Sequence, residues 1–247
     1  MEFKADALVL RAADWGEYDK IVTLFTAERG KLSAALKGVK RAGAKLKFAA
    51  QPFCFAEFVF AEKAGRHTVI SAALHDGFYP LREDIACYYA AVVLCEACDR
   101  LLFEGIESPA LFLAAVRTLE ALSSCAEGTG GEGRLEDGRS GSSYVLLRFL
   151  LTALKEAGYP VSAAACPHCG EQLSGRMRFD MESGAFGCEA CGGGVPASES
   201  TYLAVRAALG QGGEVTADGV KRALRLLSAY FAFQASELPS LAEYLRL

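Results

Sequence analysis

Four cysteines in two close pairs are the residues of this chain whose spacing most clearly predicts chemistry. Cys166 and Cys169 form one C-x-x-C pair, and Cys188 and Cys191 form a second pair after eighteen intervening residues. Four thiolates arranged in this way are the preferred donor set of a tetrahedral Zn²⁺, and a site closed by four protein ligands is structural rather than catalytic. A glycine directly follows each pair and lets the backbone turn toward the sulfur atoms. The spacing therefore predicts a zinc ribbon that holds one structural zinc ion.

The first cysteine pair also permits a different chemistry. The sequence C-P-H-C matches the active site of disulfide oxidoreductases, in which a nearby His and a helix N-terminus lower the thiol pKa. The alternative is thus a thiol/disulfide redox protein that uses Cys166 and Cys169. This interpretation lacks a thioredoxin-like strand before the pair and leaves the second pair unexplained. The other five cysteines are expected in the core: Cys54, Cys87, Cys95, Cys98 and Cys125.

A second chemical signal is a run of positive charge in a chain that is otherwise acidic. The whole chain has 26 Lys and Arg against 30 Asp and Glu, yet residues 29–56 contain basic side chains and not one carboxylate. Such clustering favours binding to a polyanion, because each neutralised phosphate releases condensed counterions. A solvated loop that only aids solubility, or a site for an acidic protein, would give the same pattern. The predicted phosphate contacts are Lys31, Lys37, Lys40, Arg41, Lys45 and Lys47.

The elements that must position the basic run are short and rich in β-branched and aromatic residues. Five such segments, separated by turn signals, occupy residues 7–12, 21–28, 31–38, 53–61 and 67–74. They predict a small closed or half-closed antiparallel barrel, with the basic run in and after its third strand. Trp15 and Tyr18 lie between the first two strands. They are candidates for stacking on nucleic-acid bases, although packing on the barrel would explain each of them equally well.

The second part of the chain is predicted to be helical. Apolar residues recur at helical spacing in residues 81–105, 109–125, 144–159, 200–210 and 217–238. The Gly/Ser-rich residues 126–143 between them predict a flexible loop. The fold class is therefore α+β, with a barrel domain over residues 1–79, a helical domain over 80–160 and 200–247, and the zinc ribbon inserted at 161–199. No apolar run approaches the roughly 18 residues that span a bilayer, and the cysteines without an export signal indicate a reducing cytoplasm.

Motifs of enzymatic catalysis were sought and not found in the sequence. It has no G-x-x-x-x-G-K-[ST] loop, no G-x-G-x-x-G after a strand, no H-E-x-x-H and no G-x-S-x-G. His67 and His75 flank a predicted strand without a recognisable carboxylate or serine partner, and His168 is read as a spacer between the cysteines of its pair. We therefore expect a binding protein rather than an enzyme.

Residues 7–41 combine a strand, a Glu/Asp turn and a Lys-Gly-basic segment, and residues 49–53 are AAQPF. With the order of the parts, these segments resemble the RecO family of bacterial recombination mediators, which has a similar opening pattern and an "LQPF" strand entry. The chain departs from the pattern after Lys40 and Arg41, where AGAKLK replaces a Ser and further arginines.

The resemblance implies an OB-fold that binds single- and double-stranded DNA and anneals complementary strands. It implies a place in the RecF pathway of recombinational repair, where the protein acts with RecR to load RecA onto strands coated by the single-stranded-DNA-binding protein SSB. It also implies a cytoplasmic, nucleoid-associated protein. The SSB tail is acidic and apolar, so we expect its receptor on residues 217–238, where basic residues lie beside apolar ones: Lys221, Arg222, Arg225, Leu226, Tyr230 and Phe231. Ordinary core packing explains these apolar positions at least as well.

Overall fold

The first five strands close into a barrel. In this computed structural model, which describes residues 1–128 and 141–247, the strands are β1 Glu2–Trp15, β2 Asp19–Thr26, β3 Gly30–Leu36, β4 Phe55–Lys63 and β5 Arg66–Asp76. Their order around the barrel is β1-β2-β3-β5-β4, and all neighbours are antiparallel except β3 and β5. This closed, OB-like barrel confirms the predicted one, and each predicted segment overlaps one of the five strands.

The middle of strand β1, residues 7–10, is buried on both faces, and its sequence shows why. Side chains alternate across a strand, so Ala7 and Val9 enter the barrel core while Leu8 and Leu10 enter the core of the helical part. A bulge between Val9 and Arg11 shifts the register against β2. The same strand therefore belongs to two hydrophobic cores and joins them.

Helices follow the barrel, as predicted. They are α1 Ile85–Leu101, α2 Pro109–Ala126, α3 Ser142–Glu156, α4 Glu199–Ala208, α5 Ala217–Gln234 and the short α6 Pro239–Tyr244. Side chains cap three of them: Asp84 accepts from the Cys87 N–H before α1, and Ser198 and Thr216 play the same role before α4 and α5. Single 3₁₀ turns, Phe48–Ala50 and Tyr79–Arg82, precede β4 and α1. Most of the predicted flexible loop, residues 129–140, lies outside the described residues.

Helix α2 departs from the expectation that no segment is long and apolar enough to span a membrane. By length and composition alone, α2 is apolar enough to cross a membrane, and it is the one such helix in the described ranges. Leu111, Leu119 and Leu122 of this helix are buried in the helical core. A core helix passes the same test, so this feature is weak evidence for a membrane span.

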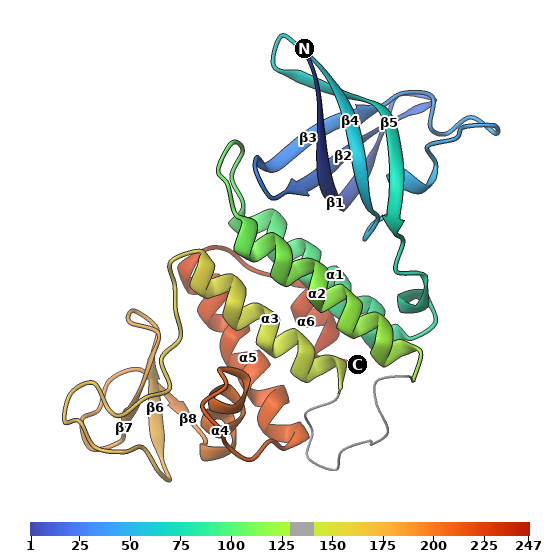
Figure 1. The fold of residues 1–247 in the computed structure, drawn as a ribbon. Helices are drawn as coiled ribbons and strands as arrows, with labels where there is room; N and C mark the ends of the chain where they lie inside the picture. Colours follow the sequence, from blue (N-terminus) through green and yellow to red (C-terminus); the bar gives the residue numbers. More distant parts are fainter. Residues whose placement is uncertain (129–140) are drawn as a thin grey trace.

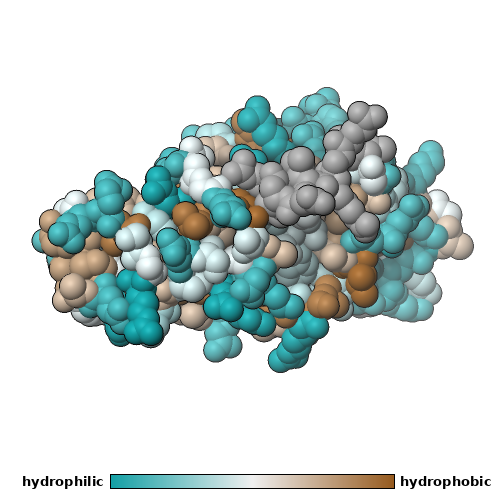
Figure 2. Space-filling view, turned by 90° about the horizontal axis from the view of Figure 1, so that it is seen from below, coloured by the Kyte–Doolittle hydropathy of each residue, from teal (hydrophilic) through white to brown (hydrophobic). Residues whose placement is uncertain are grey.

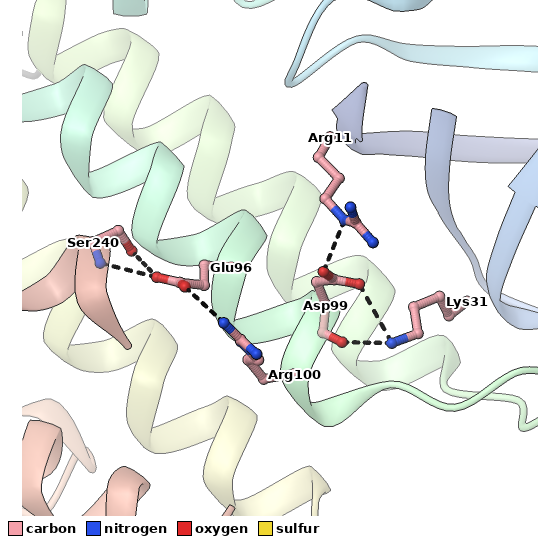
Figure 3. A network of polar contacts seen from close by, with 6 residues as sticks. All are labelled: Arg11, Lys31, Glu96, Asp99, Arg100 and Ser240. Carbon is pink, nitrogen blue, oxygen red and sulfur yellow. Dashed lines mark hydrogen bonds and ion pairs between the residues drawn. The ribbon is translucent and has the colours of Figure 1, made fainter. Parts of the chain in front are cut away.

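The carboxylate of Asp99 in α1 binds side chains from two strands of the barrel. Asp99 of α1 accepts a hydrogen bond from Arg11 Nε of β1 at 3.0 Å and forms an ion pair with Lys31 Nζ of β3 at 3.3 Å (Figure 3). Lys31 Nζ also donates to the Asp99 carbonyl at 2.6 Å. Farther along α1, Glu96 accepts from Ser240 at the start of α6 and pairs with Arg100. Ion pairs thus link the barrel to α1, and a hydrogen bond from Ser240 links α1 to α6.

The turn between β2 and β3 packs against the loop that joins α1 to α2. Gly30 has a φ of +59°, and a Cβ there would lie 2.2 Å from the Ile106 carbonyl oxygen. The Lys31 N–H donates to the Phe103 carbonyl at 3.2 Å, and the Gly105 N–H donates to the Arg29 carbonyl at 3.1 Å. Only glycine combines this backbone conformation with so close an approach.

A small three-stranded sheet lies at the far end of the helices from the barrel (Figure 1). Its strands, β6 Met177–Asp180, β7 Ala185–Cys188 and β8 Val195–Ala197, are arranged β7-β6-β8. Phe179 packs edge-to-face on Tyr230 of α5, and Phe186 packs in the same way on Tyr202 of α4. Seen from below, hydrophilic and hydrophobic side chains are interspersed over the part of this face that is not grey (Figure 2).

Candidate metal centre and nucleic-acid interface

The four cysteines of the two C-x-x-C pairs converge at one end of the small sheet. The sulfur atoms of Cys166, Cys169, Cys188 and Cys191 all lie within 4.8 Å of one another. The Cys169 and Cys188 sulfurs are 3.7 Å apart. A tetrahedral zinc ion with Zn–S bonds of about 2.3 Å requires sulfur atoms about 3.8 Å apart. The donor set and its spacing therefore fit a metal ion of this type.

Backbone turns bring the sulfur atoms together. Gly170 and Gly192, which follow the two pairs, have φ values of +76° and +69°. The Gly170 N–H donates to the Cys166 carbonyl and closes the first knuckle at 2.9 Å. Beside the second knuckle, a Cβ on Gly194 would lie 2.2 Å from the Phe179 carbonyl oxygen, and Arg178 donates to the Gly194 carbonyl at 2.8 Å. The third strand, which the sequence did not predict, completes this end of the sheet.

The thiols of the cluster differ strongly in acidity. Backbone N–H groups of Cys188, Cys169 and His168 lower the pKa of Cys166 to about 6. Hydrogen bonds to the Cys188 and Cys169 sulfurs raise the pKa of Cys191 to about 12. Four thiolates this close repel one another, so all four ionise together only around a cation. The most acidic thiol, Cys166, is also buried, which removes it from the reach of a disulfide substrate.

The remaining cysteines occupy the positions expected of core residues. Burial raises the pKa of Cys54 and of Cys87 to about 12, and it also raises the pKa values of Cys95 and Cys98. Cys125 is partly buried and packs against the same helical core. These thiols are held in their neutral form and are poor nucleophiles.

The basic residues after β3 lie on a loop at the side of the barrel, away from the helices (Figure 1). We call residues 37–47 the basic loop. Buried Val39, Ala49 and Ala50 anchor its base in the barrel core, and Lys47 Nζ closes it by donating to the Ala42 carbonyl at 2.8 Å. Its charged members are exposed, namely Lys37, Lys40, Arg41, Lys45 and Lys47.

Lys31 differs from the other predicted phosphate contacts. Its ammonium group is only partly exposed and is held by the Asp99 side chain and carbonyl. The sequence contains no sign of this pairing, because the two residues are 68 positions apart. The structure therefore gives Lys31 a role in joining the barrel to α1.

The hairpin between β1 and β2 is attached to the basic loop. The Lys40 N–H donates to the Tyr18 carbonyl at 3.0 Å, and the Gly38 N–H donates to Asp19 Oδ1 at 2.7 Å. Lys40 Nζ pairs with Asp14 at 2.9 Å. This hydrogen bond to Lys40 lowers the pKa of the Asp14 carboxyl. Asp14 is thus a carboxylate within the positively charged surface, which the sequence reasoning did not single out.

Two sequence-based expectations are wrong in detail. Tyr230 and Phe231 cannot line a surface pocket for a peptide, because both are buried and Tyr230 supports the small sheet. Among the apolar residues predicted there, Leu226 alone borders a surface hollow of about 320 Å³, together with Arg222 and Arg225. His75 does have a carboxylate partner, since its Nε2 lies 2.8 Å from Asp6 Oδ1.

Family models and individual relatives of this chain all point to the same protein family. A family model described as "Recombination protein O N terminal" matches residues 1–78, and one described as "Recombination protein O C terminal" matches residues 133–242. The DNA repair protein RecO of Nocardioides sp. is 32% identical over 243 residues, covering 94% of each chain. That of Myxococcus xanthus is 32% identical and covers 81% of this chain and 76% of its own length.

More divergent relatives extend beyond the matched region. The DNA repair protein RecO of Desulfitobacterium hafniense is 28% identical over 190 residues, and the match spans 76% of this chain but only 64% of that relative. The two family models cover the barrel and the part of the chain from α3 onward, and the match to the Nocardioides protein, over 94% of each chain, joins them. The chain therefore belongs to the RecO family of DNA repair proteins.

Proposed function

We propose that this chain is a DNA-binding mediator of the RecF pathway that binds single- and double-stranded DNA through the basic loop and anneals complementary strands. The observation that carries the proposal is the exposure of Lys37, Lys40, Arg41, Lys45 and Lys47 on one side of an OB-like barrel. OB barrels bind nucleic acid through a positively charged groove that follows the backbone. Residues 1–79 would then form the DNA-binding domain, with Lys31 reserved for its contact with Asp99.

Annealing by this surface needs no catalytic residue. Two complementary strands repel one another through their phosphates, and this repulsion slows their encounter. Cations of the basic loop bind phosphates and release their counterions, which reduces the repulsion between strands held at the same surface. We therefore propose a non-enzymatic function.

The helical domain, residues 80–160 and 200–247, is the proposed site of protein partners. With RecR, the chain would help to load RecA onto SSB-coated DNA in the cytoplasm, at the nucleoid. We propose that the SSB tail binds at the hollow beside Leu226, where Arg222 and Arg225 are exposed and complement its acidic residues. Unchanged tail affinity after charge reversal of Arg222 and Arg225 would exclude this location.

The proposed role of the inserted residues 161–199 is structural. One zinc ion held by the four converging thiols would supply coordination energy that the small sheet lacks, because a three-stranded sheet of this size has little core of its own. The ion completes the fold and leaves no open position for a substrate.

The decisive experiment measures DNA affinity and strand annealing at increasing salt for the wild-type protein and a Lys40→Ala/Arg41→Ala variant. We expect wild-type binding to weaken steeply with salt. The variant should lose about 1.8 units of the slope of log affinity against log salt on duplex DNA and about 1.4 units on single strands, since each phosphate contact contributes about 0.9 and about 0.7 respectively. Lys63→Ala/Arg66→Ala, at the end of β4 and the start of β5, removes the same number of charges outside the basic loop and serves as the control. Absence of DNA binding by the wild type at low salt would reject the proposed function.

A thiol/disulfide redox function based on Cys166 and Cys169 is the second candidate, and the low pKa of Cys166 favours it. The two functions predict different zinc contents and different thiol reactivities. One zinc ion per chain with four protected thiols supports the structural site, whereas a reactive Cys166 in zinc-replete protein supports redox chemistry. The burial of Cys166 favours the first outcome.

A further inference from the structure

The only tryptophan of the chain lies on the surface, beside the basic loop. Trp15 is 65% exposed at the end of β1, whereas the largest side chains of the barrel core, Phe58 and Phe60, are fully buried. Packing on the barrel, which the sequence left open for Trp15, therefore does not account for its position. Single exposed apolar residues are common on protein surfaces. Exposure alone therefore does not indicate a function for Trp15, and the neighbouring residues have to be considered.

The hairpin that carries Trp15 is bound to the basic loop. The neighbouring residue Asp14 pairs with Lys40 at 2.9 Å and with Lys20 at 3.6 Å. At the other end of the turn, Tyr18 and Asp19 accept hydrogen bonds from backbone N–H groups of the basic loop. These bonds hold the hairpin against the basic loop from both sides of the turn. Trp15 is therefore an exposed residue of a hairpin whose backbone and whose Asp14 carboxylate are bound to the basic loop.

Tyr18 has a different environment from Trp15. Its ring lies under the Arg41 guanidinium, with Arg41 Cζ 5.0 Å from the ring centroid, and it is 43% exposed. A cation over an aromatic face is an attractive pair. Tyr18 thus orients Arg41, and Trp15 is the aromatic side chain of this hairpin whose surface is open to a ligand.

We propose that Trp15 stacks on an unpaired base of single-stranded DNA whose phosphates contact the basic loop, and so gives the surface a preference for single strands. The inference rests on the proposed DNA binding and deepens it. Stacking on an aromatic side chain tolerates every base because each has a π-face. In a duplex both faces of each base are already stacked, so Trp15 strengthens binding to single strands only.

The test uses Trp15→Leu, which keeps an apolar side chain without a ring, and Trp15→Phe, which keeps a smaller ring. Affinities are measured by fluorescence anisotropy of labelled oligothymidylate, of a duplex of the same length, and of an abasic oligonucleotide with the same number of phosphates. We expect Trp15→Leu to weaken binding to oligothymidylate by roughly 5- to 150-fold. Binding to the duplex and the abasic strand should be unchanged, and Trp15→Phe should retain part of the affinity.

Intrinsic fluorescence provides a second readout, because Trp15 is the sole tryptophan. Oligothymidylate should quench it, and the abasic strand should leave it nearly unchanged. If the wild type binds DNA and Lys40→Ala/Arg41→Ala weakens that binding, while Trp15→Leu has no effect and no quenching occurs, stacking is wrong and the proposed function stands. Equal losses by Trp15→Leu on all three ligands would also overturn stacking. Absence of any DNA binding would reject the inference together with the proposed function.

Discussion

At the scale of single residues, Asp14 limits the positive charge of the proposed DNA surface. We expect Asp14→Asn to bind DNA a few-fold more tightly at low salt, because a unit charge about 4 Å away is worth about 1 kcal/mol in water. The gain should shrink as salt screens the charges. Glu57→Gln is a suitable control, since Glu57 pairs with Lys4 between β1 and β4. Weaker binding by Asp14→Asn would mean that holding Lys40 in place outweighs the charge.

The same carboxylate gives a pH dependence with a defined sign. Its hydrogen bond to Lys40 lowers the pKa of Asp14, so Asp14 stays ionised at pH values where an unfolded aspartate starts to protonate. The contribution of the Asp14–Lys40 ion pair to the attachment of the basic loop to the hairpin is therefore fully present above about pH 4 and is lost as the pH falls through the lowered pKa. Between pH 5 and pH 8 the ratio of Asp14→Asn to wild-type affinity should stay constant. A carbon-detected NMR titration of the Asp14 carboxyl would report the direction of the pKa shift.

At the scale of elements, Gly30 is the turn residue on which the packing of β2 and β3 against the helices depends. Gly30→Ala would place a Cβ 2.2 Å from the Ile106 carbonyl oxygen and 2.6 Å from the Phe103 carbonyl oxygen. A left-handed backbone alone costs a non-glycine residue on the order of 1–3 kcal/mol, and the clash adds to this. Urea unfolding should show a clearly lower midpoint for Gly30→Ala than for Gly65→Ala.

Gly65→Ala measures the cost in stability of the left-handed backbone conformation without a steric clash. Gly65 in the β4–β5 turn has a similar φ of +72°, but a Cβ there would meet nothing within 4 Å. Equal midpoints for the two variants would show that the contact between the turn and the α1–α2 loop contributes nothing to stability.

Local sequence patterns predicted most of the elements but few of the contacts between them. The five strands followed from β-branched composition and turn signals, and the helices from apolar spacing, because both patterns reflect burial of a single face. The Lys31–Asp99 pair joins distant residues, and the burial of Tyr230 depends on Phe179 of the inserted sheet. From the sequence alone, the apolar face of residues 217–238 could either pack in the core or bind the SSB tail. Only the tertiary arrangement shows that the core and the inserted sheet cover Tyr230 and Phe231.

At the scale of the whole molecule, residues 1–128 and 141–247 form two hydrophobic cores. The barrel interior is one cluster, while the helices and the small sheet share the other, which Met177, Phe179 and Phe186 enter from β6 and β7. The outer face of β1 and the Asp99 ion pairs connect the two parts. A disturbance at the metal centre should therefore reach α4 and α5 before it reaches the barrel.

Removal of the metal tests this separation. We expect a strong chelator, or a variant with serine at the four cysteines of the cluster, to lower the thermal midpoint and to increase hydrogen exchange in α4, α5 and the small sheet. The reason is that the hairpin packs on Tyr202 and Tyr230 and loses its fixed end without the four-ligand site.

DNA affinity at moderate temperature should survive this treatment, because the barrel core and the basic loop are untouched. Cys95→Ala/Cys98→Ala is the matched control, since these residues have the same C-x-x-C spacing inside α1 and are buried there. That variant should keep one zinc ion per chain. An unchanged melting temperature and unchanged exchange after loss of the four thiols would show that the small sheet is stable without a metal. Loss of DNA binding in parallel would show that the two cores are coupled more tightly than the Asp99 contacts and β1 account for.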